Sequence, residues 1–166
     1  MPMITVPYFD GAEVEFVDAD LDDPESIAAL ETFLSLTKAD RYSDARHVLA
    51  YYKDYSEEAG KPDWLEEEIG TLASPVEIWR HVTPGPVVVE NGRGEDENRY
   101  VVMEAECAWN SERGLMLVWR NGTILSKVGG YNGHVTNANA YRDETLKDVV
   151  YKARNSEYTT RLSDHT

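Results

Sequence analysis

The stretch from Arg99 to Tyr141 constrains the fold more than any other part of this 166-residue chain. Its first part alternates between two kinds of side chain, and a period of two places successive residues on opposite faces of a strand. Glu104 and Glu106 belong to the polar face. The apolar face consists of Val101, Met103, Ala105, Cys107 and Trp109. We therefore predict a strand with one buried and one solvated face, on which Cys107 is a buried and inert thiol.

Two further strands follow in the same stretch. Leu115–Trp119 is apolar on both faces, which is typical of a central strand that is covered on both sides. Asn121-Gly122 is the strongest hairpin signal in the chain, because both residues tolerate positive φ. Thr123–Val128 is the return strand. The pattern predicts three consecutive antiparallel strands, followed by an irregular polar loop from Tyr131 to Tyr141.

The N-terminal part predicts a hairpin and then a helix. Strands over Met3–Phe9 and Glu13–Val17 flank the turn signal Asp10-Gly11. Asp23 has the side chain of an N-cap, and proline and glutamate follow it, so we expect a helix over 26–36. Its apolar stripe would consist of Ile27, Leu30, Phe33 and Leu34.

A second helix is predicted over 37–59, with Thr37 as its cap and Asp40 in a capping-box position. Its periodicity places His47 and Asp54 on the outward face. The inward face would consist of Val48, Leu49, Tyr52 and Tyr55. Ser74-Pro75 begins a short helix, and a strand is expected over Val87–Glu90.

The C-terminal part predicts one more helix, capped by Asp143 and running to Tyr151. Residues 152–166 have little periodicity, and we expect them to fray. The prediction is a single domain over 1–151 of the α+β class, in which helices pack on one face of a mainly antiparallel sheet.

The order of these signals resembles a known family. The resemblance rests on the pattern C-x-W-x-x-E-x-G-L-x-L-V-W-R-N-G over 107–122 and on G-H-x-T-x-A-x-A-Y over 133–141. Pro7-x-Phe9-Asp10-Gly11 and Glu77-x-Trp79-x-x-Val82-x-Pro84 belong to the same likeness. The family is a bacterial group of small acidic domains of unknown function. The resemblance extends to about Asp143 and implies no catalytic residue.

Charge narrows the possible partners. The net charge is −15, and residues 1–70 hold 18 acidic and 5 basic side chains, a net charge of −13. Such a field repels phosphate backbones and anionic lipid and favours a basic partner, although it also serves solubility alone. One cysteine, no secretory signal and no long apolar run predict a cytoplasmic protein without contact to membranes.

Catalytic motifs are lacking. The sequence contains no P-loop, GxGxxG, HExxH or G-x-S-x-G pattern. One cysteine and four histidines, at positions 47, 81, 134 and 165, do not make a usual zinc site. The acidic run from Asp18 to Asp23 departs from the EF-hand template, so helix capping explains it better than calcium. We expect neither a metal nor a cofactor.

The polar loop is the best candidate for a site, since loops that carry several hydrogen-bonding groups often bind ligands. His134 is the candidate acid/base, with Glu104 or Glu106 as a second carboxylate and Cys107–His134 as a weaker nucleophile–base pair. The same loop groups can instead satisfy its own backbone. The candidate binding residues are Asn132, His134, Thr136, Asn137, Asn139, Tyr141, Trp109, Glu112 and Arg120, with a Glu112–Arg120 pair across the hairpin.

Three functions remain open from the sequence. The first is a non-catalytic, acidic protein-binding module of the inhibitor or immunity type that engages a basic protein. The second is an enzyme or small-ligand domain with its pocket at the loop over 131–141. The third is a nucleic-acid mimic that competes with DNA for basic proteins. Nothing in the sequence fixes the oligomeric state.

Overall fold

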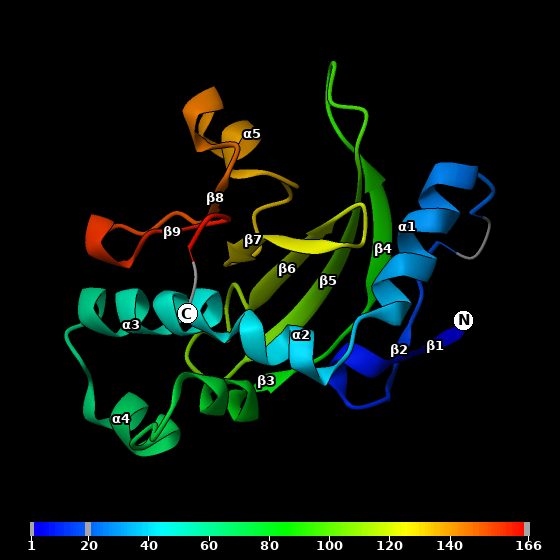
Figure 1. Ribbon diagram of the computed structural model, residues 1–166. Helices are drawn as coiled ribbons and strands as arrows, with labels where there is room; N and C mark the ends of the chain where they lie inside the picture. Colours follow the sequence, from blue (N-terminus) through cyan, green and yellow to red (C-terminus); the bar gives the residue numbers. More distant parts are fainter. Residues whose placement is uncertain (1, 19–20, 165–166) are drawn as a thin grey trace.

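The computed structural model describes residues 2–18 and 21–164 and is organised around one antiparallel sheet (Figure 1). The sheet runs in the order β3-β5-β6-β7, and β4 also pairs with β5. Its strands are β3 (Val82–Thr83), β4 (Val87–Asn91), β5 (Arg99–Cys107), β6 (Leu115–Arg120) and β7 (Ile124–Gly129). The predicted α+β class and the three consecutive strands are confirmed.

The hydrophobic core covers both faces of β6, as its apolar sequence predicts. All residues from Leu115 to Trp119 are buried. On the first face, Trp119 packs against Tyr8 and Phe33, with ring centroids 5.1 and 4.5 Å apart. The second face is a smaller cluster of Tyr100, Val102, Met116, Val118 and Val135. Val135 comes from the loop after β7, so this loop covers the second face.

The N-terminal elements cover the first face. They form a hairpin, four α-helices and two 3-10 helices, and Figure 1 shows α1 at one end of the sheet and α3 at the other. The elements are β1 (Met3–Val6), η1 (Pro7–Phe9), β2 (Ala12–Glu15), α1 (Pro24–Ser35), α2 (Lys38–Ser43), α3 (Ala45–Glu58), α4 (Asp63–Ile69) and η2 (Pro75–His81).

The predicted helix starts are confirmed. The Asp23 carboxylate accepts from Ser26 N at 3.3 Å, and Pro24 takes the first helical position of α1. Thr37 and Ser74 each begin a capping box. The apolar stripe of α1 was partly wrong, because Ile27 is exposed and the buried side chains are Ser26, Ala29 and Phe33.

The single helix expected over 37–59 is instead two helices that meet at Asp44. Asp44 accepts a hydrogen bond of 2.9 Å from the buried Tyr8 hydroxyl. The outward placement of His47 and Asp54 was also wrong, since their exposed fractions are 2% and 3%. The C-terminal segment, residues 149–164, packs on this side of α3 and buries both residues.

The C-terminal segment is structured, contrary to the prediction. The helix expected from Asp143 to Tyr151 is replaced by a 3-10 turn and a strand, and residues 152–164 do not fray. The elements are α5 (Asn137–Tyr141), η3 (Glu144–Leu146), β8 (Val149–Tyr151), η4 (Ser156–Tyr158) and β9 (Thr160–Arg161). β8 and β9 pair antiparallel, and Thr160 Oγ1 lies 2.7 Å from His47 Nδ1.

Candidate functional site

A cleft of about 450 Å³ lies beside the predicted loop, at the outer edge of the sheet. Its walls come from four places: α3, the turn over 110–113, the end of β7 with the loop after it, and the C-terminal segment over 151–154. In Figure 1, β8 and α5 lie on the β7 side of the molecule, and β8 runs from α5 toward α3. A volume of this size suits a small-molecule ligand.

Lys127 lines the cleft and was not predicted as a site residue from the sequence. A bulge between Val118 and Trp119 brings Lys127 opposite Val118 and Leu125 opposite Trp119, so the Lys127 and Leu125 side chains enter opposite faces. Lys127 is only 1% exposed. The lone basic residue of the strand was visible in the sequence, whereas the bulge that directs it was not.

The Lys127 ammonium is bonded to neutral acceptors. Nζ donates to the Asn132 side-chain oxygen and, at 2.6 Å, to the backbone oxygen of His134, and it lies 3.5 Å from Met116 Sδ. Burial lowers the pKa of Lys127 to about 8, because an apolar surrounding disfavours the charged form. Lys127 therefore fixes the loop and places a positive charge beneath it.

The α3 wall of the cleft is held by Asp54. Its carboxylate accepts from the Tyr151 hydroxyl at 2.6 Å and from the backbone N–H groups of Arg154 and Asn155 at 2.9 and 3.1 Å. These bonds fix the C-terminal segment on α3. Because both oxygens are engaged, Asp54 is a positioning residue and offers little to a ligand.

The predicted loop residues divide between the cleft and the support of the loop. Asn132, Asn137 and Tyr141 line the cleft. Asn137 is nevertheless structural, since its amide donates to the carbonyls of Val149 and Val150 at 2.8 and 3.0 Å. Thr136 caps α5 by accepting from Asn139 N at 3.0 Å.

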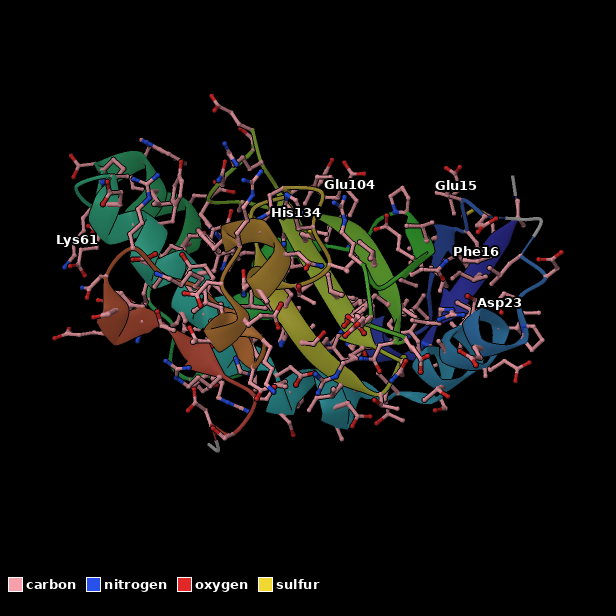
Figure 2. The ribbon with its side chains drawn as sticks, turned by 90° about the horizontal axis from the view of Figure 1, so that it is seen from above. Glu15, Phe16, Asp23, Lys61, Glu104 and His134 are labelled. Atoms are coloured by element: carbon pink, nitrogen blue, oxygen red, sulfur yellow. The ribbon has the colours of Figure 1, made fainter. Side chains whose placement is uncertain are left out.

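His134 is not among the residues that line the cleft. Its backbone joins the Lys127 network, and its ring Nδ1 is buried without a hydrogen-bond partner in the described part of the chain. Glu104 and Glu106 are exposed on the second sheet face, and Figure 2 shows Glu104 and His134 on the same side of the molecule. Catalysis by these three residues stays a prediction.

The remaining candidates lie apart from one another. Trp109 is fully buried and packs on Tyr51 with ring centroids 5.5 Å apart. Glu112 lines the cleft, whereas Arg120 lies at the other end of β6 and 4.0 Å from Asp148. The predicted Glu112–Arg120 pair was therefore wrong, because β6 runs its full length between the two positions.

Cys107 is buried at the end of β5, as predicted. Its Sγ donates to the carbonyls of Gly114 and Asn110 at 3.4 and 3.7 Å. Burial raises the pKa of the thiol to about 11, so the reactive thiolate is disfavoured. The thiol faces the helix-covered side of the sheet, whereas the loop with His134 covers the other side. This geometry gives no support to a Cys107–His134 pair.

Among residues 2–18 and 21–164, no group of three histidine, cysteine or carboxylate side chains could hold a metal ion. His165 and residues 19–20 of the acidic run lie outside the described residues. In the same part of the chain, no helix has the length and apolar character needed to cross a bilayer.

Comparison with known proteins places the chain in a family. A family model described as a domain of unknown function, DUF6985, matches residues 2–135. The chain belongs to the DUF6985 family. No curated protein and no solved structure matches this chain. The resemblance to a family of unknown function is thereby confirmed.

The family match ends within the loop that covers Lys127. The sheet, the N-terminal helices and Lys127 lie inside the DUF6985 match, whereas Tyr141, Tyr151 and Arg154 lie beyond it. The cleft of this DUF6985 domain therefore forms where the family domain meets the C-terminal segment.

The acidic residues 1–70 of this DUF6985 domain extend from one end of the molecule to the other. In Figure 2, Glu15 and Asp23 mark one end and Lys61, next to α4, marks the other. On α4, Leu65 and Ile69 are buried, while Trp64 is 55% exposed. The neighbouring carboxylates Asp63, Glu66, Glu67 and Glu68 are all exposed. Sequence reasoning had not singled out Trp64.

Proposed function

We propose that this DUF6985 domain is a bacterial, cytoplasmic and non-catalytic module that binds a basic protein partner, as inhibitor and immunity proteins do. The observation that carries the proposal is the exposed Trp64 among the carboxylates of α4. Glu67 and Glu68 follow Trp64 by three and four positions, so the three side chains share one side of the helix. We call this surface, Trp64 with Glu67 and Glu68, the α4 face.

The chemistry of the α4 face matches a lysine or arginine side chain. A tryptophan ring attracts a cation placed over it, and adjacent carboxylates supply charge-assisted hydrogen bonds. Tryptophan is also among the residues most enriched in interface hot spots. Burial of Leu65 and Ile69 fixes the orientation of α4, so that the α4 face is already in place before a partner arrives.

The charge of the whole protein supports the same partner class. A net charge of −15 accelerates the encounter with a basic protein at low ionic strength and slows it when salt screens the field. A nucleic-acid mimic would share this property, but it would bind several unrelated DNA-binding proteins.

The test is a pull-down from the native host's lysate at low and moderate salt. We expect one basic protein in stoichiometric amount, lost as salt rises. Trp64→Ala should weaken this complex by about 30-fold, which corresponds to about 2 kcal/mol. The variant Glu67→Gln/Glu68→Gln should weaken it as well.

The matched control is Glu13→Gln/Glu31→Gln, which removes the same charge from exposed positions elsewhere in the acidic N-terminal part. It should retain the partner. A partner held equally by all variants would exclude the α4 face. The lack of any stoichiometric partner at low salt would exclude the function, and capture of many DNA-binding proteins would favour the mimic.

A further inference from the structure

We infer that the cleft between α3, the end of β7 and the C-terminal segment binds a small organic anion that carries a planar ring. This site is separate from the α4 face and does not depend on the function proposed for it. The volume of about 450 Å³ accommodates a ligand of one or two rings.

The charge of the cleft differs in sign from that of the protein. The chain has 16 basic and 31 acidic side chains, yet the cleft is lined by more cations than carboxylates. The cations are Arg113, Lys127, Lys152 and Arg154, and the carboxylates are Asp54, Glu58 and Glu112. A positive cavity in an acidic protein concentrates small anions, because low-dielectric walls focus its field.

The carboxylates offset these cations only in part. Arg154 pairs with Glu58 at 3.0 Å, and the two remaining carboxylates, Asp54 and Glu112, stand against three remaining cations. Within the described residues, Arg113, Lys127 and Lys152 form no ion pair with a carboxylate. Among residues 2–18 and 21–164, the Lys152 ammonium donates a hydrogen bond only to the Ala153 carbonyl, at 3.2 Å. Positive charge in the cleft is therefore left for a ligand to neutralise.

Lys127 gives this argument its strongest support. A buried ammonium without a carboxylate partner is costly, since three neutral acceptors do not replace its hydration and a counter-ion. An anion in the cleft would supply that counter-ion. Asn132, whose side-chain oxygen accepts a hydrogen bond from Lys127 Nζ, also lines the cleft.

The ring requirement comes from the aromatic walls. Tyr51, Tyr55, Tyr141 and Tyr151 line the cleft. The Tyr141 ring is 53% exposed, and Lys152 Nζ lies 5.8 Å from its centre. A planar group stacked on Tyr141 would bring its anionic substituent to Lys152.

The experiment is an NMR titration of the full chain with two matched probe pairs. Benzoate and benzamide differ in charge, and phenyl phosphate and inorganic phosphate differ in the ring. We expect saturable shifts of the Gly129, Gly130 and Tyr151 amides with benzoate or phenyl phosphate, and none with benzamide or inorganic phosphate.

Variants connect the shifts to the cleft. Lys127→Met and Lys152→Gln should each weaken binding about tenfold or more, the usual effect of losing a charged hydrogen-bonding group. Lys53→Gln, on exposed α3 surface outside the cleft, should not change it. Lys152→Gln keeps the test decisive if Lys127→Met loosens the loop.

Three results would overturn the inference. The first is no saturable shift with any probe in the millimolar range. The second is equal binding of benzamide and benzoate, which would show that the site does not require a negative charge. The third is equal binding of inorganic phosphate and phenyl phosphate, which would show that the site does not require a ring. None of these results affects the partner test at the α4 face.

Discussion

At the scale of single residues, His47 connects stability to pH. Its imidazole is buried against Thr160, and burial lowers its pKa to about 4 from an ordinary value of 6.5. Between these two values the unfolded chain binds a proton at His47 that the folded chain does not. The free energy of unfolding should therefore fall as pH falls through this window, by roughly 3 kcal/mol in total. We expect His47→Gln to lose less stability than the wild type on acidification, measured by urea unfolding at neutral and acidic pH.

The Asp44 carboxyl changes stability with pH in the opposite direction to His47. The effect of His47 is therefore measured as the difference between the wild type and His47→Gln. Burial raises the pKa of Asp44 to about 6 from 3.8, and the folded chain keeps a proton there that the unfolded chain releases. Asp44 thus favours folding as pH falls over this range. His81→Gln, at the end of η2, is the control histidine. A wild-type-to-His47→Gln difference that does not change with pH would contradict the buried neutral imidazole.

Local residue patterns were predicted well because they depend on few neighbours. Asp23, Thr37 and Ser74 each cap the helix start that their sequences indicate. The failures at His47 and Asp54 have one cause. Both residues are covered by a segment about a hundred positions away, and helical periodicity contains no information about it.

At the scale of elements, the β6–β7 turn packs closely against the backbone of α1 at Gly122. Asn121 and Gly122 have φ of 53° and 72°, as the hairpin signal predicts. A Cβ on Gly122 would stand 2.0 Å from the Ala29 carbonyl oxygen and 2.9 Å from Phe33 N. Gly122→Ala should therefore cost about 3 kcal/mol or more, from backbone strain together with displacement of α1.

The control for this substitution is Gly133→Ala. Gly133 has a similar φ of 77°, but nothing lies within 4 Å of its added Cβ. It should cost only about 1 kcal/mol, the strain of positive φ alone. Equal losses in thermal or chemical unfolding would show that α1 does not rest on the turn.

The C-terminal segment should loosen as a unit when its anchor on α3 is removed. Asp54→Ala leaves the Tyr151 hydroxyl and two backbone N–H groups without their acceptor, at a cost of about 3 kcal/mol. Hydrogen exchange should accelerate over 149–164 more than over β5 and β6. Glu66→Ala, exposed on α4, is the control. Unchanged exchange in the segment would contradict the anchoring role.

At the scale of the whole molecule, the sheet was predictable and the cleft was not. Alternation along β5 and the apolar run on both faces of β6 depend on adjacent residues only. These patterns therefore predicted where the strands lie, which faces they bury and their order in the sheet. The cleft depends on the bulge that orients Lys127 and on the packing of residues 151–154 against α3. Both are tertiary features that a local sequence pattern does not contain. Likewise, the net charge of −13 over residues 1–70 does not reveal that this part of the chain extends from one end of the molecule to the other.

The division of the cleft at residue 135 has a consequence for divergence within the family. One wall, with Lys127, lies within the DUF6985 match, whereas Tyr141, Tyr151, Lys152 and Arg154 follow the matched region. Substitutions at Tyr141, Lys152 and Arg154 can change the chemistry of the cleft, because none of the three belongs to the buried main core. Relatives that share this sheet are thus free to evolve different ligand preferences through the tail alone.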